Sequence, residues 1–366
     1  MKIIFIASAA SIHSLRWIRF FSQKKDFEIE WITFAYPTHQ TKNEYEILKD
    51  EILIHNFKTF KGILNSLKSL FDSKKKLVHV HYLGWHSLLI LLVNKLNSKI
   101  ILTPWGSDIK SIKFGLKKIW FKYIFSKSSF IICDSERLKK TSIKLGANKK
   151  NIFISMFGVD VNEYKNKRQI FADMPNIFIG SNRRLDKIYD VKTFIESAKI
   201  ISEKNNNLSF LVAGEGPLEE EYKSYVCKNK LQKKVKFIGS LNKKEMIDFY
   251  NRLDIYVSTS LSDGGLSSSI AEAMSFRRIV IVTKNSDNLN WIKEEENGFL
   301  FNEGDSKALA KEIEKIISSI DKAKINQISD NARELIKNKY SYTKEMNKTD
   351  AIYKNLYKSF ASKVSR

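Results

Sequence analysis

Short apolar runs of strand length alternate with helix-like segments along the whole chain, and this alternation limits the folds that it can adopt. In the first half, the predicted strands lie at about residues 3–7, 29–34, 52–55, 77–82, 100–104, 130–134 and 152–156, and the predicted helices at about 13–23, 57–71, 86–96, 112–125 and 136–145. The strand runs are continuously apolar, which is typical of parallel strands that are covered on both faces of a sheet. We therefore predict an α/β fold with a Rossmann-like, doubly wound layer.

The same alternation begins again after a polar stretch at about residues 162–169, which we interpret as a linker. Predicted strands follow at about 177–180, 209–213, 236–239, 255–259, 279–283 and 298–301, and the closing helices lie at 307–318, 324–339 and 343–360. A length of 366 residues suits two domains. We predict one Rossmann-like domain over 1–165, a second over 170–340, and a helix over 341–366 that packs back toward the first. Because ligands bind outside the carboxyl ends of parallel strands, we expect the two domains to face each other across a cleft.

Residues 258–273, with the sequence STSLSDGGLSSSIAEA, join a predicted buried strand to a helix through a glycine turn. Glycines let the backbone approach a ligand, and the first turn of a helix leaves N–H groups without partners, so this junction can bind a phosphate. Asp263 and Glu272 bracket the junction, and carboxylates there suit hydroxyl groups beside the phosphate. A sugar nucleotide offers both groups, although a strand, a glycine turn and a serine-capped helix also occur for folding reasons alone.

The net charge of +23 is concentrated in the first half of the chain, where residues 1–165 carry 28 Lys and Arg against 13 Asp and Glu. The remainder carries 35 against 27. Nucleic acid, an anionic membrane surface and a lysine-rich proteome would each explain such an excess. Cys133 and Cys227 form neither a disulfide framework nor a metal-binding spacing, which fits a reducing cytoplasm. The apolar runs at 3–6 and 88–93 are too short for a signal peptide or a membrane span, and we expect neither.

Seven phrases follow one another at the predicted strand ends. They are residues 11–17 (SIHSLRW), 103–108 (TPWGSD), 133–136 (CDSE), 158–160 (GVD), 181–185 (SNRRL), 214–217 (GEGP) and 263–274 (DGGLSSSIAEAM). With these phrases the whole chain resembles the family 4 glycosyltransferases of the GT-B fold, also called glycosyl transferases group 1. The resemblance implies a hexosyltransferase that holds a nucleotide sugar in the carboxyl-terminal domain and the acceptor in the amino-terminal domain.

The resemblance implies donor-binding roles for several residues of the second domain. Glu272 would accept hydrogen bonds from the ribose hydroxyls. Backbone N–H groups would hold the phosphates or the donor sugar along a short segment, made of Gly264, Gly265, Leu266, Ser267 and Ser268. The acids of the family are usually separated by seven residues, whereas eight residues separate Asp263 from Glu272 here. Glu215, within the GEGP phrase, would be either a donor contact or part of a structural turn.

Positive charge near the departing diphosphate would stabilise it as the bond to the sugar breaks. The candidates are Arg184 and Lys187, because the family usually carries an arginine followed by a lysine five residues later, where this chain has Tyr189. Lys187 is then a shifted substitute, and Arg183 competes with it. No Asp-x-Asp pair is present in the sequence. We therefore expect activity without a metal ion, and no cofactor other than the donor itself.

In the first domain, Ser11 and Trp105 are predicted to lie on the acceptor side, with Trp105 offering a stacking face for a sugar ring. His13 either donates to a phosphate or acceptor oxygen, or serves only in capping and packing. Asp108 follows a predicted strand end, where an acceptor hydroxyl would lie. Asp108, His13 and Asp263 are the candidates for catalysis, and the sequence identifies none of them as a general base.

The family retains the anomeric configuration, and no residue here is marked as a carboxylate nucleophile. We therefore expect a front-face reaction, in which the departing phosphate takes the proton of the acceptor. Two alternatives remain at this point: a nucleotide-sugar 2-epimerase of similar fold, and a non-catalytic glycan-binding protein. The donor would be linked to uridine or guanosine diphosphate, and the acceptor would be a glycan, lipid-linked, in the synthesis of a bacterial surface polysaccharide or glycoconjugate.

Residues 57–76 combine an apolar stripe at three- and four-residue steps with six lysines, and residues 113–127 repeat this composition. Such a stripe either packs on its own sheet or lies at an anionic bilayer. Nucleic acid is the poorer alternative, because no nucleic-acid-binding module is recognised, and we expect no nucleic-acid partner. A lipid-linked acceptor would explain a basic surface, so we expect a cytoplasmic protein that is peripheral at the inner face of the cell membrane.

Overall fold

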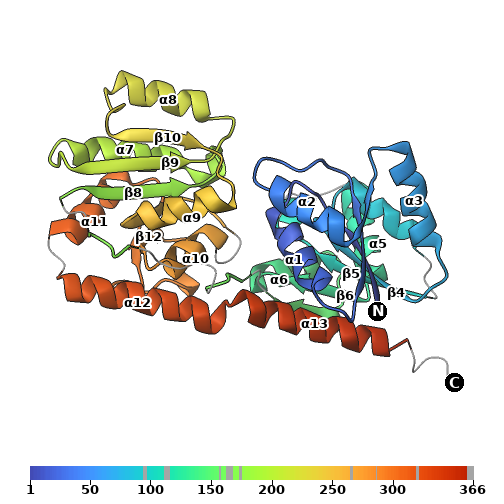
Figure 1. Ribbon diagram of the computed structural model, residues 1–366. Helices are drawn as coiled ribbons and strands as arrows, with labels where there is room; N and C mark the ends of the chain where they lie inside the picture. Colours follow the sequence, from blue (N-terminus) through green and yellow to red (C-terminus); the bar gives the residue numbers. More distant parts are fainter. Residues whose placement is uncertain are drawn as a thin grey trace. The chain divides into compact units, whose positions relative to one another are not determined.

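The chain divides into two compact units in the computed structural model (Figure 1). Unit 1 comprises Met1–Phe157 and Thr343–Arg366, and unit 2 comprises Gly158–Tyr342. The structure describes residues 1–93, 97–110, 116–155, 158–161, 168–172, 175–263, 267–285, 287–318 and 321–360. The division between the units falls shortly before the stretch interpreted as a linker at 162–169, most of which lies outside the described residues.

Unit 1 contains a seven-stranded parallel sheet, as the continuous apolar runs predict. Its strands are β1 (Lys2–Ile6), β2 (Glu28–Thr33), β3 (Leu53–Asn56), β4 (Lys76–His81), β5 (Ser98–Thr103), β6 (Phe130–Cys133) and β7 (Ile152–Ile154). They lie in the order β3-β2-β1-β4-β5-β6-β7, so the connections reverse direction beside β1 and the fold is doubly wound. β1 is buried along its whole length, which suits the continuously apolar run IIFI that follows Lys2.

Helical segments connect these strands. They are α1 (Ile12–Ser22), α2 (Lys42–Glu51), α3 (Phe60–Phe71), η1 (Trp85–Leu92), α4 (Ser107–Lys110), α5 (Leu116–Lys127), α6 (Glu136–Lys144) and η2 (Lys149–Asn151). The helix expected at 86–96 is a 3₁₀ helix at 85–92, which differs from the α-helix that the apolar run suggested. α2 was not predicted at all, because Leu48 is the only residue of this helix that is buried and its apolar pattern is correspondingly weak.

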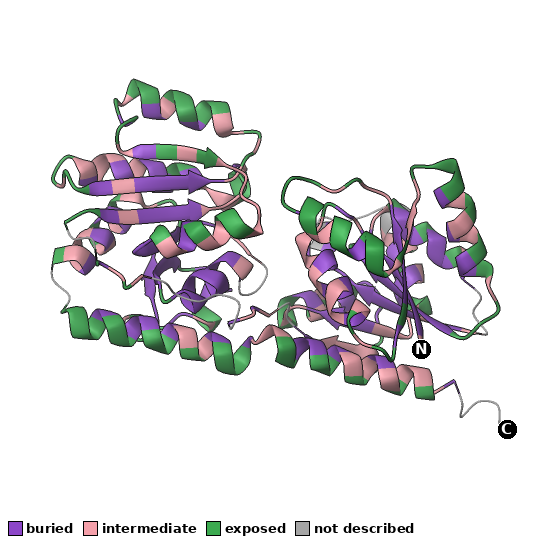
Figure 2. Cartoon of the chain, in the orientation of Figure 1, coloured by how far each residue is buried: buried purple, intermediate pink, exposed green. Residues whose placement is uncertain are grey.

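Unit 2 contains a six-stranded parallel sheet in the order β10-β9-β8-β11-β12-β13. Its strands are β8 (Ile177–Asn182), β9 (Leu208–Ala213), β10 (Val235–Gly239), β11 (Ile255–Ser258), β12 (Ile279–Thr283) and β13 (Phe299–Phe301). Its helical segments are η3 (Lys187–Tyr189), α7 (Val191–Ser202), α8 (Glu219–Lys228), α9 (Lys243–Arg252), α10 (Ser268–Ser275), η4 (Asn288–Asn290), α11 (Ser306–Ser318) and α12 (Lys322–Lys339). Each unit has its own apolar core between sheet and helices, coloured purple in Figure 2.

The last helix, α13 (Tyr342–Lys358), packs on unit 1. Tyr353 is fully buried there, with its ring 4.7 Å from that of Phe21, and its hydroxyl bonds to Nδ1 of His79. Lys24 pairs with Asp350 at 2.9 Å. Residues 274 positions apart in the chain therefore meet in one core.

No helix in the described ranges combines the length and the apolar character that crossing a membrane requires.

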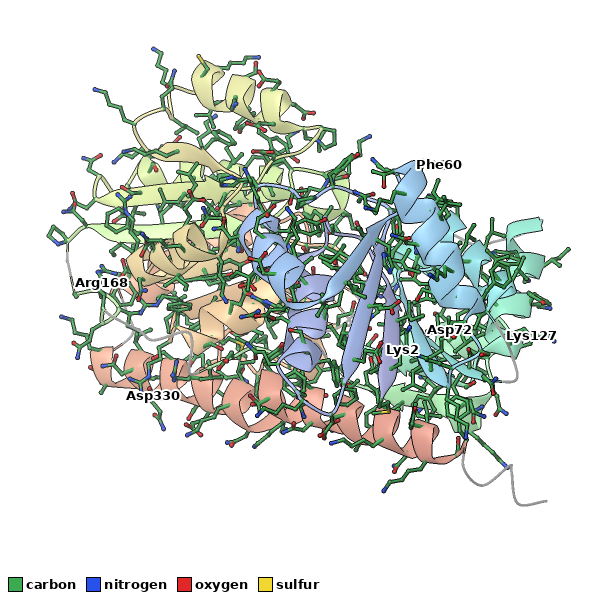
Figure 3. The ribbon with its side chains drawn as sticks, turned by 45° about the vertical axis from the view of Figure 1, so that its right-hand side comes forward. Lys2, Phe60, Asp72, Lys127, Arg168 and Asp330 are labelled. Atoms are coloured by element: carbon green, nitrogen blue, oxygen red, sulfur yellow. The ribbon has the colours of Figure 1, made fainter. Side chains whose placement is uncertain are left out.

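A cluster of charged groups lies at the amino ends of β1 and β4 in unit 1. Lys2 begins β1 and pairs with Glu30 of β2 at 2.6 Å, and Ser69 of α3 donates to the same carboxylate. Lys76 begins β4 and donates to the carbonyl oxygens of Ser69 and Asp72. Figure 3 labels Lys2 and Asp72, whose charged groups are 3.8 Å apart. The cluster therefore joins α3 to three strands of the sheet, β1, β2 and β4.

Burial would raise the pKa of Glu30, but hydrogen bonds from His55, Lys2 and Ser69 lower it to about 2. A carboxylate whose pKa is lower in the folded state stabilises the fold above its ordinary pKa, and this contribution is lost as the pH falls toward the folded value. The stabilisation by Glu30 should therefore be complete at neutral pH and should decline between about pH 4.5 and pH 2.

We predict that Glu30→Gln lowers the free energy of unfolding by about 3 kcal/mol at pH 7, because it leaves buried lysines without their counter-charge. Urea denaturation followed by tryptophan fluorescence would measure this, since five of the six tryptophans lie in unit 1. The control is Glu46→Gln, which removes an exposed pair with Lys49 and should change stability by less than about 0.5 kcal/mol. Equal effects of the two substitutions would show that the buried cluster is not stabilising.

Candidate functional site

In unit 2, the loops that follow β8, β9 and β11 are joined by backbone hydrogen bonds. Leu185 donates to the carbonyl oxygen of Glu215 at 3.1 Å, and Leu261 donates to that of Ile188 at 2.9 Å. The GEGP turn allows this close approach: a Cβ atom on Gly216 would lie 2.3 Å from the carbonyl oxygen of Leu185. The carboxyl ends of three strands therefore form one connected edge.

Arg183, in the loop after β8, is the centre of this edge. Its guanidinium donates to the hydroxyl oxygens of Ser267 and Ser269 at the start of α10, the latter at 2.8 Å, and pairs with the carboxylate of Asp263. It also lies 4.5 Å from the centre of the Tyr189 ring. Burial would lower the pKa of Arg183, but the charge of Asp263 raises it overall. The cation is therefore permanently charged beside the first turn of α10.

Glu272, on α10, is buried rather than exposed as a solvated helix residue would be. Its Oε2 atom lies 3.1 Å from the hydroxyl of Tyr250, which also lies 3.2 Å from the carbonyl oxygen of Ser269 and accepts a hydrogen bond from Asn182 at 2.8 Å. Ser269 thus contacts both the arginine cluster and the tyrosine that holds Glu272. A cation at the start of α10 and a carboxylate one turn further along are thus linked through one serine and one tyrosine.

The other predicted donor residues are placed differently. Arg184 is 67% exposed in its side chain and lies 3.7 Å from Asp186, and Lys187 is exposed in η3. Arg183, which the sequence offered only as an alternative to Lys187, therefore lies at the start of α10, whereas Arg184 lies at the surface. Glu215 is also exposed, and its carboxylate accepts the backbone N–H of Ser240 at 3.3 Å.

The segment expected to hold phosphates is only partly described. Gly264, Gly265 and Leu266 lie outside the described residues. Ser267 is the N-cap residue of α10 and Ser268 is its first residue. Asp263, the first of the two bracketing acids, is paired with Arg183.

In unit 1, aromatic and imidazole rings gather at the carboxyl ends of β1, β4 and β5. Ser11 is the N-cap of α1 and accepts a hydrogen bond from Ser14, so His13 does not cap this helix. The His13 ring lies edge-on to Trp105, with the ring centres 5.3 Å apart. Burial and the charge of Arg16 lower the pKa of His13 to about 3.

Two further histidines in this group were missed by the sequence argument. His79 and His81 lie on one face of β4, since residues two apart in a strand share a face. His81 bonds to Ser14 through Nδ1 at 3.1 Å, and His79 bonds to Thr103 through Nε2 at 2.7 Å. Burial lowers the pKa of His81 to about 3 and that of His79 well below its usual value. The signal was the pattern His-x-His inside an apolar strand, which places two polar rings in a core.

Asp108 is buried, and both of its carboxylate oxygens accept backbone hydrogen bonds. Leu83 donates to Oδ2 at 2.8 Å, and Trp105 donates to the carboxylate at 3.1 Å. Burial raises the pKa of Asp108 against the opposing effect of these bonds. The carboxylate thus joins the loop after β4 to the loop after β5 and positions Trp105, and its part in catalysis stays a prediction.

Within the described residues, no group of three or more His, Cys, Asp or Glu side chains is arranged to hold a metal ion.

We predict that Asp108→Ala lowers the free energy of unfolding by about 2–4 kcal/mol, because the N–H groups of Leu83 and Trp105 lose their buried acceptor. Asp108→Asn keeps one acceptor oxygen and should cost about 1 kcal/mol. Urea denaturation is again the measurement, with the exposed Asp50→Ala as the neutral control. If Asp108→Ala were as stable as the unchanged protein, the proposed positioning role would be wrong.

Two family models match this chain. Residues 162–335 match the model of the glycosyl transferases group 1, and residues 2–135 match that of the glycosyl transferase 4-like domain. The capsular polysaccharide biosynthesis glycosyltransferase CapM of Staphylococcus aureus is 26% identical over 272 residues, which cover 70% of this chain and 69% of CapM. The amylovoran biosynthesis glycosyltransferase AmsK of Erwinia amylovora is 24% identical over 256 residues, which cover 68% of this chain and 62% of AmsK.

Solved structures of the same fold cover almost the whole chain. A glycosyltransferase from Rickettsia africae is similar with a TM-score of 0.75 and 17% identity, over 97% of this chain and 98% of the other. HepE from Anabaena, in complex with UDP-glucose, is similar with a TM-score of 0.77 and 16% identity, over 97% of this chain and 100% of HepE. The two doubly wound units are thus those of the GT-B fold, and the chain belongs to the group 1 glycosyltransferases, with an amino-terminal domain of the glycosyl transferase 4-like type.

Proposed function

We propose that this enzyme transfers a hexosyl group, with retention of configuration, from a UDP- or GDP-linked sugar to a lipid-linked glycan. The product would be part of a bacterial surface polysaccharide or glycoconjugate. One observation carries the proposal: Arg183 contacts the start of α10, Glu272 lies one turn further along the same helix, and Ser269 and Tyr250 join the two. A fixed cation and a buried carboxylate in this arrangement suit a diphosphate and the hydroxyl groups beside it.

The similar proteins support the general part of this function, which is glycosyl transfer in polysaccharide biosynthesis. CapM and AmsK are glycosyltransferases of capsular polysaccharide and amylovoran biosynthesis. The structure of HepE contains UDP-glucose. By analogy, a polysaccharide product and a uridine-linked donor are the first choices for a test.

The charge arrangement supports a role for Arg183 in leaving-group stabilisation. When the bond between the anomeric carbon and the phosphate oxygen breaks, the bonding electrons stay on the diphosphate, which gains negative charge. The guanidinium of Arg183 and the N–H groups of the first turn of α10 would stabilise this charge. In the front-face reaction, the same phosphate oxygen takes the proton of the acceptor hydroxyl as that hydroxyl bonds to the anomeric carbon.

Glu272 would accept hydrogen bonds from the ribose hydroxyls, and the hydroxyl of Tyr250 would hold its carboxylate in position. Asp263 would then be a positioning residue, since its carboxylate faces Arg183 rather than a ligand.

On the acceptor side we retain Ser11, His13, Trp105 and Asp108. The low pKa of His13 keeps its imidazole neutral at physiological pH, so that it can donate a single hydrogen bond without adding charge. We propose that the enzyme works in the cytoplasm, peripheral to the inner face of the cell membrane.

The experiment is a thermal unfolding assay with uridine and guanosine diphosphates and their sugar conjugates, because a ligand that binds only the folded state raises the midpoint. We expect one base class to raise Tm, and Glu272→Ala to reduce this shift while the protein stays folded. Release of the nucleoside diphosphate should rise with added glycan acceptor and should continue in excess chelator. A midpoint that no nucleotide moves would contradict the donor site, and a strict metal requirement would contradict the role given to Arg183.

Arg183 and Arg184 are adjacent and provide a matched pair of variants. Arg183→Lys keeps the charge but loses the forked contacts to Ser267, Ser269 and Asp263, and we predict that it lowers kcat/KM about 100-fold, which corresponds to about 2.7 kcal/mol. Arg184→Lys should change kcat/KM by less than about threefold, because that side chain is largely exposed. Steady-state release of the nucleoside diphosphate would measure kcat/KM for both variants. The reverse order of effects would return the leaving-group role to Arg184.

A further inference from the structure

We propose that the outward face of α3, together with the neighbouring 3₁₀ helix η1, is a docking surface for an anionic lipid bilayer. The α3 face consists of Phe60, Leu64 and Phe71, flanked by Lys61 and Lys68. Its apolar residues are exposed, and Phe60, labelled in Figure 3, is 78% exposed. For its biological purpose the inference rests on the proposed transfer to a lipid-linked glycan, but the surface itself can be tested without any donor.

The exposed residues of α3 form one stripe on the side of the helix that faces away from the sheet. At about 100° per residue, Phe60, Leu64 and Phe71 lie within about 40° of one another. The buried residues Gly62 and Ser69 lie on the opposite side. Figure 2 shows exposed residues along the outward side of α3. The apolar stripe of this segment therefore does not simply pack on its own sheet.

Contacts at both ends fix α3 in this orientation. At the amino-terminal end, a Cβ atom on Gly62 would lie 1.9 Å from the carbonyl oxygen of Asn56, so only glycine fits against the end of β3. At the carboxyl-terminal end, Ser69 donates to Glu30, and Lys76 donates to the carbonyl oxygens of Ser69 and Asp72. A rotation that buried Phe60 or Leu64 would break these contacts. The exposure of the stripe is thus a consequence of how the helix is held.

η1 presents a second apolar stripe beside α3. Its residues Trp85, Leu88 and Leu91 are each about half exposed, and they recur every three residues, which is one turn of a 3₁₀ helix. α3 and η1 pack together, and the ring of Phe57, just before α3, lies 6.1 Å from that of Trp85. The two stripes are therefore neighbouring parts of unit 1.

The positive charge around these two stripes favours an anionic bilayer as the binding partner. Besides the buried Lys76, residues 57–76 contain five exposed lysines and one acid, Asp72, whose carboxylate faces Lys2. η1 contains neither Lys, Arg, Asp nor Glu. Lys58 extends over the exposed ring of Tyr36, at 4.9 Å from its centre. An aromatic and aliphatic stripe bordered by lysines is complementary to acyl chains beneath anionic headgroups. A second copy of the chain would bring like charges together.

The test is co-sedimentation with vesicles of phosphatidylglycerol and phosphatidylcholine, compared with vesicles of phosphatidylcholine alone. We expect the unchanged protein to bind the anionic vesicles, and Lys61→Gln with Lys68→Gln to weaken binding about 25-fold, since each lysine near such a surface contributes about fivefold. Phe60→Ser with Leu64→Ser should weaken it at least tenfold. The matched controls lie in unit 2: Lys307→Gln with Lys311→Gln, and the exposed Leu289→Ser, should bind as the unchanged protein does.

Each outcome separates this surface from the proposed function. Nucleotide-induced shifts in Tm should be the same in all α3 variants, because none of these residues belongs to the donor site. If the unchanged protein binds nucleotide but no anionic vesicle, the docking surface and the peripheral location are wrong, while the proposed sugar transfer stands. If vesicle binding survives in both α3 variants, the surface lies elsewhere and the inference is overturned. If the unchanged protein is instead a dimer that Phe60→Ser separates, the face is a self-interface and the inference is also overturned.

Discussion

The ion pair between Arg183 and Asp263 is the interaction on which the candidate donor site depends. A guanidinium that is largely shielded from solvent needs a counter-charge. Asp263 supplies it from the loop after β11, the strand that lies beside β8 in the sheet. The remaining donors of the guanidinium then orient the serines that begin α10. The parallel sheet makes this arrangement feasible, because it brings the loops after β8 and β11 to the same edge. One pair of charges thus links a turn, a helix start and a stacked aromatic ring.

Much of the fold could be predicted from the sequence, because buried parallel strands leave a plain signal. The runs IIFI in β1 and IVIV in β12 are continuously apolar and rich in β-branched residues, and both strands are buried. The start of α10 was also predictable from its serines and glycines. α2 was not, since a helix that buries one leucine has almost no apolar periodicity.

The details of the site were harder to predict for a physical reason. Arg183 and Arg184 are chemically identical neighbours, and only the path of the loop after β8 decides which one is buried beside Asp263. α3 posed a related problem: Gly62, Ser66 and Ser69 have the composition of a solvent-facing stripe, yet they face the sheet. Gly62 comes close to the end of β3, the Ser69 hydroxyl donates to Glu30 of β2, and the Ser66 hydroxyl donates to the Gly62 carbonyl within the helix. Polarity alone does not identify a buried face when the face is built from small side chains.

The position of α13 has a consequence for the order in which the protein matures on the ribosome. Unit 2 is one continuous stretch, Gly158–Tyr342, so it has all of its residues as soon as that stretch emerges. Unit 1 is begun first but completed last, because Tyr353 fills the space beside His79 and Phe21. During synthesis the side chains that Tyr353 covers, Phe21 among them, therefore stay uncovered while all of unit 2 is translated. Domains usually fold in the order of their synthesis, and this chain reverses that order for its final step.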